Sequence, residues 1–370
     1  MKLIDKRTKY EFDDVLKLAC RENNNKRGFL FVNRLQGKHI PCNPAETVKF
    51  ISELGELVKK EVKGNTGVLA FAETATAIGA IVASTIGEDT YYITTTRANL
   101  HRDTLVEFRE EHSHAPEQLL YGDAQEFKNL DTLVFVDDEF TTCNTVMNCI
   151  TELKNKELIS ENTRIVIASL SNCLTDSRYA ELKALGYRVV YLFRFEKGDC
   201  NLEVESNNLN QEINVENVVN TTVRVPIGIE FRLGCKIKDF DSVIKGITKG
   251  INLNLKSDSV VLVVGTEECM YPAIKIGESL DDKLTIYTQS TTRSPIVVSK
   301  DREYPLRTRV EFESPYSSDR TTYLYNVKKY DKVIVVTDSK RIIDGDNTLI
   351  RRLAEAGNKD ITIIRLENIL

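Results

Sequence analysis

The sequence predicts an α/β protein of two domains, each with a parallel sheet flanked by helices. Short apolar runs of strand length alternate with apolar stripes at helical spacing, which is the pattern of βαβ units. A chain of 370 residues is longer than one ordinary core supports. The order of strand-ending motifs in the first half recurs weakly in the second half, which indicates a duplicated fold.

The composition is that of a globular protein, with 41% hydrophobic and 28% charged residues. No apolar run approaches the ~20 residues of a membrane span, and the first residues lack the apolar core of a signal peptide. The eight cysteines include no C-x-x-C pair, which favours reduced thiols in a cytoplasm over disulfides or a zinc site. A net charge of -5 without a long basic run gives no support to nucleic-acid binding. We expect a cytoplasmic protein whose partners are small molecules, with no nucleic acid and no membrane.

The first half contains the elements of one complete sheet. A helix is expected to begin at Pro44, because the apolar residues that follow repeat at helical spacing. The polar, Asn-rich stretch from 198 to about 219 indicates a linker, so we expect domains at 1–219 and 220–370. Strands are expected at 28–33, 67–72, 91–97, 133–136, 164–169 and 188–193, with helices at 80–86 and 176–185.

The most specific motif follows the strand at 133–136. Two acids, Asp137 and Asp138, end this strand, and a loop of small polar residues leads into the apolar face of a helix. The backbone N–H groups of such a loop and the helix dipole favour an anion, and carboxylates accept hydrogen bonds from sugar hydroxyls. The motif predicts a ribose 5-phosphate site, with an ordinary α/β turn as the alternative. The loop residues are Thr141, Thr142, Cys143, Asn144 and Thr145.

Two further strand ends carry residues suited to an anion. Small residues follow the strand at 67–72, where they let the backbone approach a ligand, and a helix N-terminus follows them. Arg97 ends the next strand, and its planar guanidinium suits a diphosphate, although a surface ion pair is the alternative. The candidate loop residues are Ala72, Glu73, Thr74, Ala75 and Thr76.

Three of the four histidines lie between 101 and 114, where a side chain that titrates near neutral pH can carry a proton. We expect His112 or His114 to handle a proton or to steady a leaving group. A metal site there lacks a clear third ligand, and a polar edge is the other alternative. Lys38 and His39 are candidates for ligand contact or for an ordinary turn. The candidate catalytic residues are Glu110, Glu111, His112 and His114.

Together these motifs resemble the type I phosphoribosyltransferases, which bind 5-phosphoribosyl 1-pyrophosphate (PRPP). The resemblance implies that Asp137 and Asp138 hold the ribose 2- and 3-hydroxyls and that residues 141–145 wrap the 5-phosphate. Residues 72–76 and Arg97 would take the pyrophosphate, beneath a hood formed by 110–114. Relatives usually have glycine where Cys143 stands, so a positive φ there would store ~1–3 kcal/mol of strain.

Longer segments narrow the resemblance to the phosphoribosyltransferase of tellurium-resistance-associated bacterial operons. They are Gly37-Lys-His-Ile-Pro, Ala72-Glu-Thr-Ala-Thr-Ala and Phe108-Arg-Glu-Glu-His-Ser-His-Ala. The segment Thr292-Arg-Ser-Pro295 and its surroundings resemble the TRSP domain that accompanies this enzyme. The resemblance implies an orotate-phosphoribosyltransferase-like enzyme that makes a nucleoside-like metabolite.

The second half keeps the order of the motifs, and the comparison pairs Glu267 with Glu73 and Arg293 with Arg97. It lacks the acidic pair, since only Asp338 is in register with an acid. We therefore expect a second phosphoribosyltransferase-like α/β domain that lacks the full PRPP motif. Glu267, Tyr271 and Arg293 lie at or near its strand ends, where ligands bind in open α/β sheets. They are candidates for an acceptor pocket, and a dimerisation or scaffold module is the alternative.

The expected reaction is displacement of pyrophosphate from PRPP by a nitrogen nucleophile. Mg²⁺ would be held through PRPP, without a dedicated set of protein ligands, because this ion uses few protein carboxylates when phosphates are present. A non-catalytic PRPP sensor or scaffold is one alternative, and a PRPP synthetase-like diphosphotransferase is another. A homodimer is compatible with each of them.

Overall fold

The structure is a computed structural model that describes residues 1–22, 28–109, 117–197, 218–250, 253, 255–280, 283–341 and 348–368. The chain forms two compact units, each made of three segments. The first unit contains Met1–Phe12, Lys49–Cys200 and Ile229–Ser242. The second contains Asp13–Val48, Asn201–Gly228 and Val243–Leu370. The expected linker at 198–219 lies almost wholly outside the described residues.

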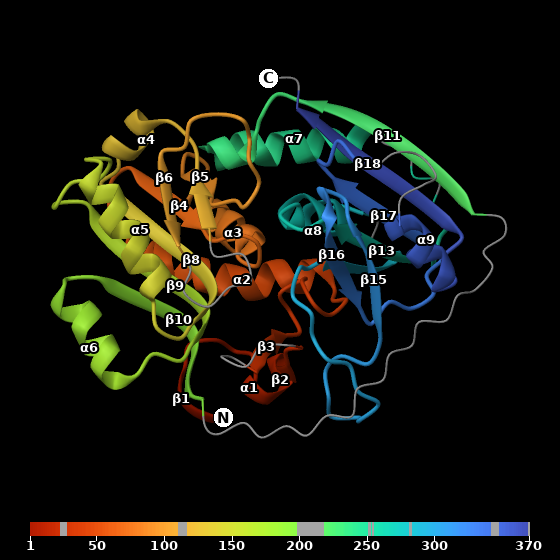
Figure 1. Cartoon of the computed structure of the whole chain (residues 1–370), viewed down its shortest axis with the longest axis horizontal. Coiled ribbons are helices and arrows are strands. Elements are labelled where there is room, and N and C mark those ends of the chain that lie inside the picture. The colour runs from red at the N-terminus through yellow and green to blue at the C-terminus, as the bar shows by residue number, and fades with distance from the viewer. Residues whose placement is uncertain are drawn as a thin grey trace. The chain divides into compact units, whose positions relative to one another are not determined.

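The first unit is built on a seven-stranded sheet in the order β1-β10-β9-β8-β4-β5-β12 (Figure 1). Its central strands pair in parallel, and the edge strands β1 and β12 pair antiparallel. The parallel α/β sheet predicted from the sequence is therefore confirmed. The strands are β1 (Lys2–Lys6), β4 (Thr66–Ala70), β5 (Tyr91–Thr94), β8 (Thr132–Phe140), β9 (Arg164–Asn172), β10 (Arg188–Glu196) and β12 (Cys235–Lys236).

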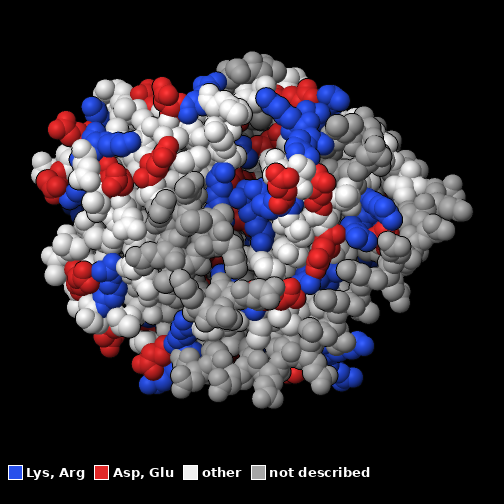
Figure 2. All heavy atoms as spheres, in the orientation of Figure 1, with Lys and Arg blue, Asp and Glu red and all other residues white. Residues whose placement is uncertain are grey.

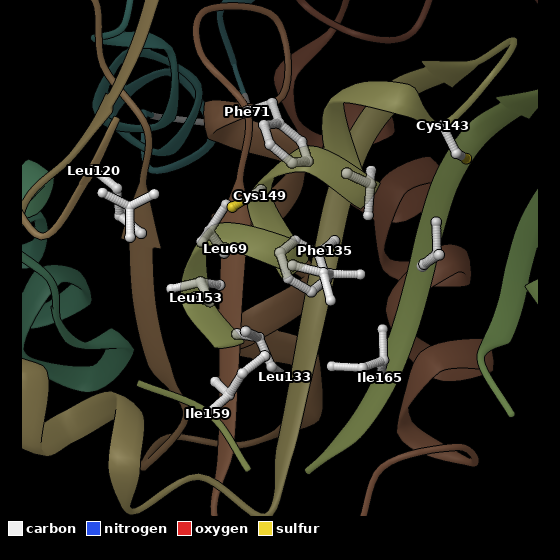
Figure 3. Packing of buried hydrophobic residues seen from close by; sticks show 14 of the residues in the cluster. Leu69, Phe71, Leu120, Leu133, Phe135, Cys143, Cys149, Leu153, Ile159 and Ile165 are labelled. Carbon is white, nitrogen blue, oxygen red and sulfur yellow. The ribbon is translucent and has the colours of Figure 1, made fainter. Parts of the chain in front are cut away.

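Helices cover both faces of this sheet. The buried stripe of α5 (Asn144–Asn155) packs against side chains of β4 and β8, among them Leu69 and Phe135 (Figure 3). The opposite face is covered by α3 (Thr76–Ile86), which approaches so closely that a Cβ on Gly79 would lie 2.4 Å from the Cβ of Ala70. The unit also contains β6 (Val106–Arg109), β7 (Glu117–Leu120), α4 (Ala124–Lys128), α6 (Asp176–Ala184) and the short helix η1 (Phe231–Leu233).

The second unit contains a five-stranded parallel sheet in the order β11-β18-β17-β13-β14. Its central strands are continuous apolar runs, as expected where both faces of a parallel sheet are covered. The helix α9 (Thr348–Glu355) and the hairpin of β15 (Arg309–Ser314) and β16 (Ser317–Tyr325) contribute to the core on one face. The helix α8 (Met270–Glu278) lies against the other, where a Cβ on Gly277 would be 3.5 Å from Val263 Cγ2. The sheet strands are β11 (Val219–Ile227), β13 (Val260–Gly265), β14 (Thr285–Ser290), β17 (Lys332–Thr337) and β18 (Asp360–Asn368).

An early segment of the chain also belongs to the second unit. The antiparallel strands β2 (Leu16–Cys20) and β3 (Phe29–Asn33) pack Ala19 and Leu30 with Ile296 and Leu306 in one buried cluster. The segment at 37–42 then runs beside β14, where Cys42 and Thr288 form an antiparallel bridge. Three helices lie at the changes between units: α1 (Phe12–Val15), α2 (Pro44–Lys59) and α7 (Ile237–Gly250).

The two sheets share a hydrogen-bonding pattern at the ends of their central strands. In the first unit, Phe71 N–H donates to the Val136 carbonyl at 3.1 Å and Thr95 N–H to the Ala70 carbonyl at 3.0 Å. The next amide, of Ala72, donates to Thr95 Oγ1 at 2.9 Å. These bonds link β4 to its neighbours β8 and β5.

The second unit repeats this pattern. Thr266 N–H donates to the Val336 carbonyl at 3.1 Å and Thr291 N–H to the Gly265 carbonyl at 2.9 Å. Glu267 N–H then donates to Thr291 Oγ1 at 2.9 Å. The second α/β domain expected from the sequence is therefore confirmed, and it has the same hydrogen-bonding pattern as the first.

The same bonds define which residues correspond. Glu267 is equivalent to Ala72, so Glu268 is the equivalent of Glu73, one residue later than the sequence comparison places it. Because Thr95 corresponds to Thr291, Arg97 corresponds to Arg293.

The described surface carries charges of both signs. In Figure 2, acidic and basic side chains are interspersed over the face in view, in keeping with a net charge of only -5. No helix in the described part of the chain is both long enough and apolar enough to cross a membrane.

Candidate active site

The carboxyl ends of β4, β5 and β8 meet at one edge of the first sheet, because these three strands are parallel neighbours. The predicted pyrophosphate loop at 72–76 follows β4, Arg97 follows β5, and the acids lie in β8 just beyond its pairing with β4. This is the edge at which open α/β sheets bind ligands. The proposed catalytic residues Glu110, Glu111, His112 and His114 lie outside the described residues.

The two acids form part of β8, which continues through Phe140 instead of ending at Val136. Asp137 and Asp138 are both half-buried. Thr74 Oγ1 donates to Asp138 Oδ1 at 3.0 Å, and Asp137 Oδ1 accepts the Asp138 N–H at 2.9 Å. The fold therefore brings the acidic motif into direct contact with the loop after β4.

Neighbouring strands fix the backbone of that loop. Besides the bond from Ala72 N–H to Thr95 Oγ1, Gln118 Nε2 donates to the Ala72 carbonyl at 3.2 Å. Tyr92 Oη donates to the Thr76 carbonyl at 2.7 Å. Such bonds hold the loop in one conformation at the N-terminus of α3, which is a requirement for preorganised anion binding. The loop residues Ala72, Glu73, Ala75 and Thr76 are buried, and Thr74 and Arg97 are half-buried.

Cys143 lies in the predicted 5-phosphate loop and has a left-handed backbone conformation, with φ 59° and ψ 17°. Its side chain is 4% exposed and packs at one end of the buried cluster beneath α5 (Figure 3). Burial raises the pKa of the Cys143 thiol to about 12, so the thiol is neutral at physiological pH. The loop therefore has the positive φ that glycine would adopt without strain, and it has a buried thiol that glycine would lack.

Cys143→Ala and Cys143→Gly separate these two effects. Both variants lose the sulfur, but only alanine keeps a Cβ in the left-handed conformation, which costs about 1–2 kcal/mol. We expect the glycine variant to have the larger free energy of unfolding by about 1 kcal/mol, as measured by urea denaturation. At an ordinary position within a helix or strand, a glycine variant is instead less stable than an alanine variant by roughly 0.5–1 kcal/mol. An alanine variant as stable as the glycine variant would contradict strain at this position.

Arg178, on α6, fastens the same loop and was not predicted from the sequence. Its Nε donates to the Thr142 carbonyl at 2.9 Å and its Nη2 to Asn144 Oδ1 at 3.3 Å. A third nitrogen, Nη1, donates to Glu181 at 2.8 Å. The guanidinium therefore holds both sides of Cys143 and brings positive charge to the predicted phosphate position.

Arg178→Ala is expected to weaken the binding of ribose 5-phosphate by roughly tenfold, since a hydrogen bond from a charged group contributes about 1.5–3 kcal/mol. Inorganic pyrophosphate, which would bind at the loop after β4, is expected to bind equally well to the variant and the wild type. Titration calorimetry with each ligand measures both effects. Glu181→Gln is the matched control, because it alters the exposed partner of Arg178 without touching the loop. Equal loss of both ligands would indicate general disruption.

The candidates in the second unit lie in two environments. Glu267 and Arg293 form an ion pair, with Arg293 Nη2 2.6 Å from Glu267 Oε2. Tyr271 is 1% exposed within α8. Lys38, one of the ligand candidates near the start of the chain, is fully buried and donates to the Glu267 carbonyl at 3.2 Å. His39, the other, is 2% exposed.

No group of three or more His, Cys, Asp or Glu side chains that could hold a metal ion occurs among the described residues. The site nevertheless fits Mg²⁺ that arrives with a diphosphate. This ion binds through one or two carboxylates together with substrate phosphates, and Asp137 and Asp138 supply carboxylates beside the predicted pyrophosphate loop.

A parallel sheet with a loop of small residues after β4, two acids in the last part of β8 and a left-handed residue before α5 defines a protein of the phosphoribosyltransferase class. Residues 15–195 match the family model for a phosphoribosyl transferase. Residues 230–353 match the model for the TRSP domain C-terminal to that family. The chain belongs to this family of phosphoribosyltransferases with a TRSP domain, as the sequence motifs predicted.

No curated protein matches the chain. Among solved structures, it is similar to the adenine phosphoribosyltransferase of Giardia lamblia in complex with 9-deazaadenine, with 15% identity over 49% of this chain and 94% of that one and a TM-score of 0.36. The adenine phosphoribosyltransferase of Trypanosoma brucei is 11% identical over 55% of this chain and 86% of that one, with a TM-score of 0.39. The orotate phosphoribosyltransferase of Aeropyrum pernix is 14% identical over 49% of this chain and 89% of that one, with a TM-score of 0.31.

Proposed function

We propose that the first unit transfers the phosphoribosyl group of PRPP to a nitrogenous acceptor and releases pyrophosphate. The observation that carries this proposal is the bond from Thr74 to Asp138. It joins the predicted pyrophosphate loop to the predicted ribose-binding acids at one sheet edge, as a single ligand with both groups would require. In the reaction the bond from C1 to the pyrophosphate oxygen breaks, pyrophosphate leaves with the electron pair, and a bond from C1 to nitrogen forms.

The residues of the chain would act mainly by position and charge. Asp137 and Asp138 accept hydrogen bonds from the ribose hydroxyls, and the loop at 141–145 donates its N–H groups to the 5-phosphate. The loop at 72–76 and Arg97 bind the pyrophosphate, whose negative charge increases as it leaves, so fixed donors there favour the transition state. When bound, Mg²⁺ would supply charge neutralisation at the pyrophosphate.

Three finer assignments belong to the same proposal. His112 or His114, with Glu110 and Glu111, would handle a proton or steady the leaving pyrophosphate. An acceptor pocket at Glu267, Tyr271 and Arg293 would supply the nucleophile, and a nucleoside-like metabolite would be the product.

The test is pyrophosphate release from PRPP and Mg²⁺ with a panel of nucleobases and other nitrogenous heterocycles, with acceptor-free reactions as the blank. Release that depends on one acceptor, together with a ribosylated product by mass spectrometry, supports the transferase. PRPP binding by calorimetry without release for any acceptor would support a PRPP sensor. Absence of PRPP binding would overturn the proposed site.

A further inference from the structure

The buried carboxylate of Glu267 lies in a shell of hydrogen-bond donors within the second unit. Arg293 Nε and Nη2 lie 2.7 and 2.6 Å from Oε2. Arg320 Nη2 donates to Oε1 at 2.9 Å and to Oε2 at 2.8 Å. Ser314 Oγ donates to Oε1 at 2.5 Å, and Thr322 Oγ1 to the same oxygen at 3.4 Å. Two guanidinium groups and two hydroxyl groups thus surround one carboxylate.

The shell is built into the fold. Glu267 is 1% exposed and has a positive φ of 46°, a conformation that non-glycine residues adopt only where the surroundings impose it. The side chain of Arg293 is 13% exposed and that of Arg320 is 29% exposed. The donors come from the segment after β14, from β16 and from the end of β15. Their convergence on one residue is the arrangement of an anion-binding site.

The position of this shell in the fold is informative. Glu267 occupies the place that Ala72 has in the first unit. The N–H of Glu267 donates to Thr291 Oγ1, as the N–H of Ala72 donates to Thr95 Oγ1. Arg293 is the equivalent of Arg97, which we have assigned to pyrophosphate. In the second unit the side chain of residue 267 therefore engages the arginine that, in the first unit, would bind the leaving group.

We propose that the second unit has kept a small anion site at the former pyrophosphate position, and that the carboxylate of Glu267 is its built-in occupant. A fork of two arginines and a hydroxyl binds one carboxylate or one phosphate group, and the latter includes a terminal phosphate of pyrophosphate. The comparison with the pyrophosphate loop rests on the proposed function, but the anion site itself does not. With the side chain in place, the second unit takes no pyrophosphate there.

The test removes the occupant and offers replacements from solution. In Glu267→Ala, prepared as the full chain, formate or acetate is expected to fill the place of the missing carboxylate. At formate about ten times its dissociation constant we expect the midpoint of thermal unfolding to rise by roughly 3–5 °C relative to equal chloride. The wild type should show no such difference. In calorimetry the variant should bind one more pyrophosphate per chain than the wild type.

Glu313→Ala is the matched control, because Glu313 is also a glutamate of the second unit in an ion pair, with Arg341 at 2.9 Å, but both side chains are almost half exposed. It should show no rescue by formate. Should Glu267→Ala be insoluble, refolding from denaturant in formate or in equal chloride replaces the thermal assay. Recovery only in formate supports the proposal.

A lack of any difference between formate and chloride in Glu267→Ala, or equal pyrophosphate stoichiometry in variant and wild type, would overturn the built-in occupant. Loss of the proposed function would appear elsewhere, as failure of the wild type to bind PRPP. The two proposals can therefore fail separately.

Discussion

Replacing Asp137 and Asp138 together by asparagine should weaken PRPP binding by at least about 100-fold. Each carboxylate would accept hydrogen bonds from ribose hydroxyls, and a hydrogen bond to a charged group contributes about 1.5–3 kcal/mol. Two such losses amount to roughly 3–6 kcal/mol, and each 1.4 kcal/mol is a factor of ten in the dissociation constant. Asparagine keeps the size of the side chain, so the loss would come from charge and acceptor capacity. Titration calorimetry with PRPP and Mg²⁺ measures the effect.

The adjacent acid gives a matched control. Glu139 lies on the same strand and is also half-buried, and it has no assigned contact with PRPP. Glu139→Gln should change the affinity for PRPP less than threefold. Asp138→Asn alone should keep the contact with Thr74, because an amide oxygen still accepts a hydroxyl hydrogen. Binding of PRPP by the double variant with unchanged affinity would remove the sugar-phosphate assignment, whatever the effect on turnover.

The sheet of the first unit was predictable because its strands are local patterns. Buried runs such as that at 133–136 need only their own residue types to be recognised. The continuation of β8 through Asp137 and Asp138 was missed, because aspartate is rare in strands and two in a row therefore predict that a strand has ended. The edge strands β1 and β12 were missed for a related reason, since short edge strands with charged residues have no strong apolar pattern.

The candidate site divides in the same way. Residues that are predicted to bind a ligand because they belong to a motif, such as Asp138, can be found from residue type and spacing. Residues that hold the motif in place cannot be found in this way. Gln118 and Arg178 donate hydrogen bonds to residues that are 46 and 36 positions away in the chain. One signal for Thr95 was present, since the pair of threonines before Arg97 recurs before Arg293. In the structure the first threonine of each pair, Thr95 or Thr291, accepts a hydrogen bond from the equivalent backbone N–H.

The second unit shows what a repeat in sequence can and cannot establish. The order of its motifs predicted a second α/β domain like the first, and the hydrogen bonds at the end of β13 repeat those at the end of β4. The register was wrong by one residue, because two glutamates stand together at 267–268 and type alone cannot choose between them. Lys38 and Arg320 could not have been grouped with Glu267, since only the fold brings the early segment and β16 to the end of β13.

Arg293→Ala is expected to destabilise the second unit by about 1.5–3 kcal/mol, which is the usual contribution of a hydrogen bond to a charged group, because Arg320 still donates to both carboxylate oxygens of Glu267. Arg293 approaches Oε2 of Glu267 through two nitrogens and is 13% exposed. Arg320→Ala should cost less, because its side chain is 29% exposed and water can take the place of the lost donor. Hydrogen exchange of the β13 and β14 amides measures the effect within the second unit alone.

The effect of Arg293→Ala on hydrogen exchange and on turnover decides between two roles for Glu267 and Arg293. If Glu267 and Arg293 form a structural ion pair, Arg293→Ala speeds exchange of β13 and β14, and a double-mutant cycle of Glu267→Gln and Arg293→Gln gives a favourable coupling energy between the two side chains. If they form an acceptor pocket, Arg293→Ala lowers turnover while exchange of these strands stays as in the wild type. The exposed pair of Glu313 and Arg341 supplies the baseline, since removing one partner of a surface ion pair costs only about 0–1 kcal/mol. The double substitution thus tests whether the charges of Glu267 and Arg293 stabilise each other or bind a ligand.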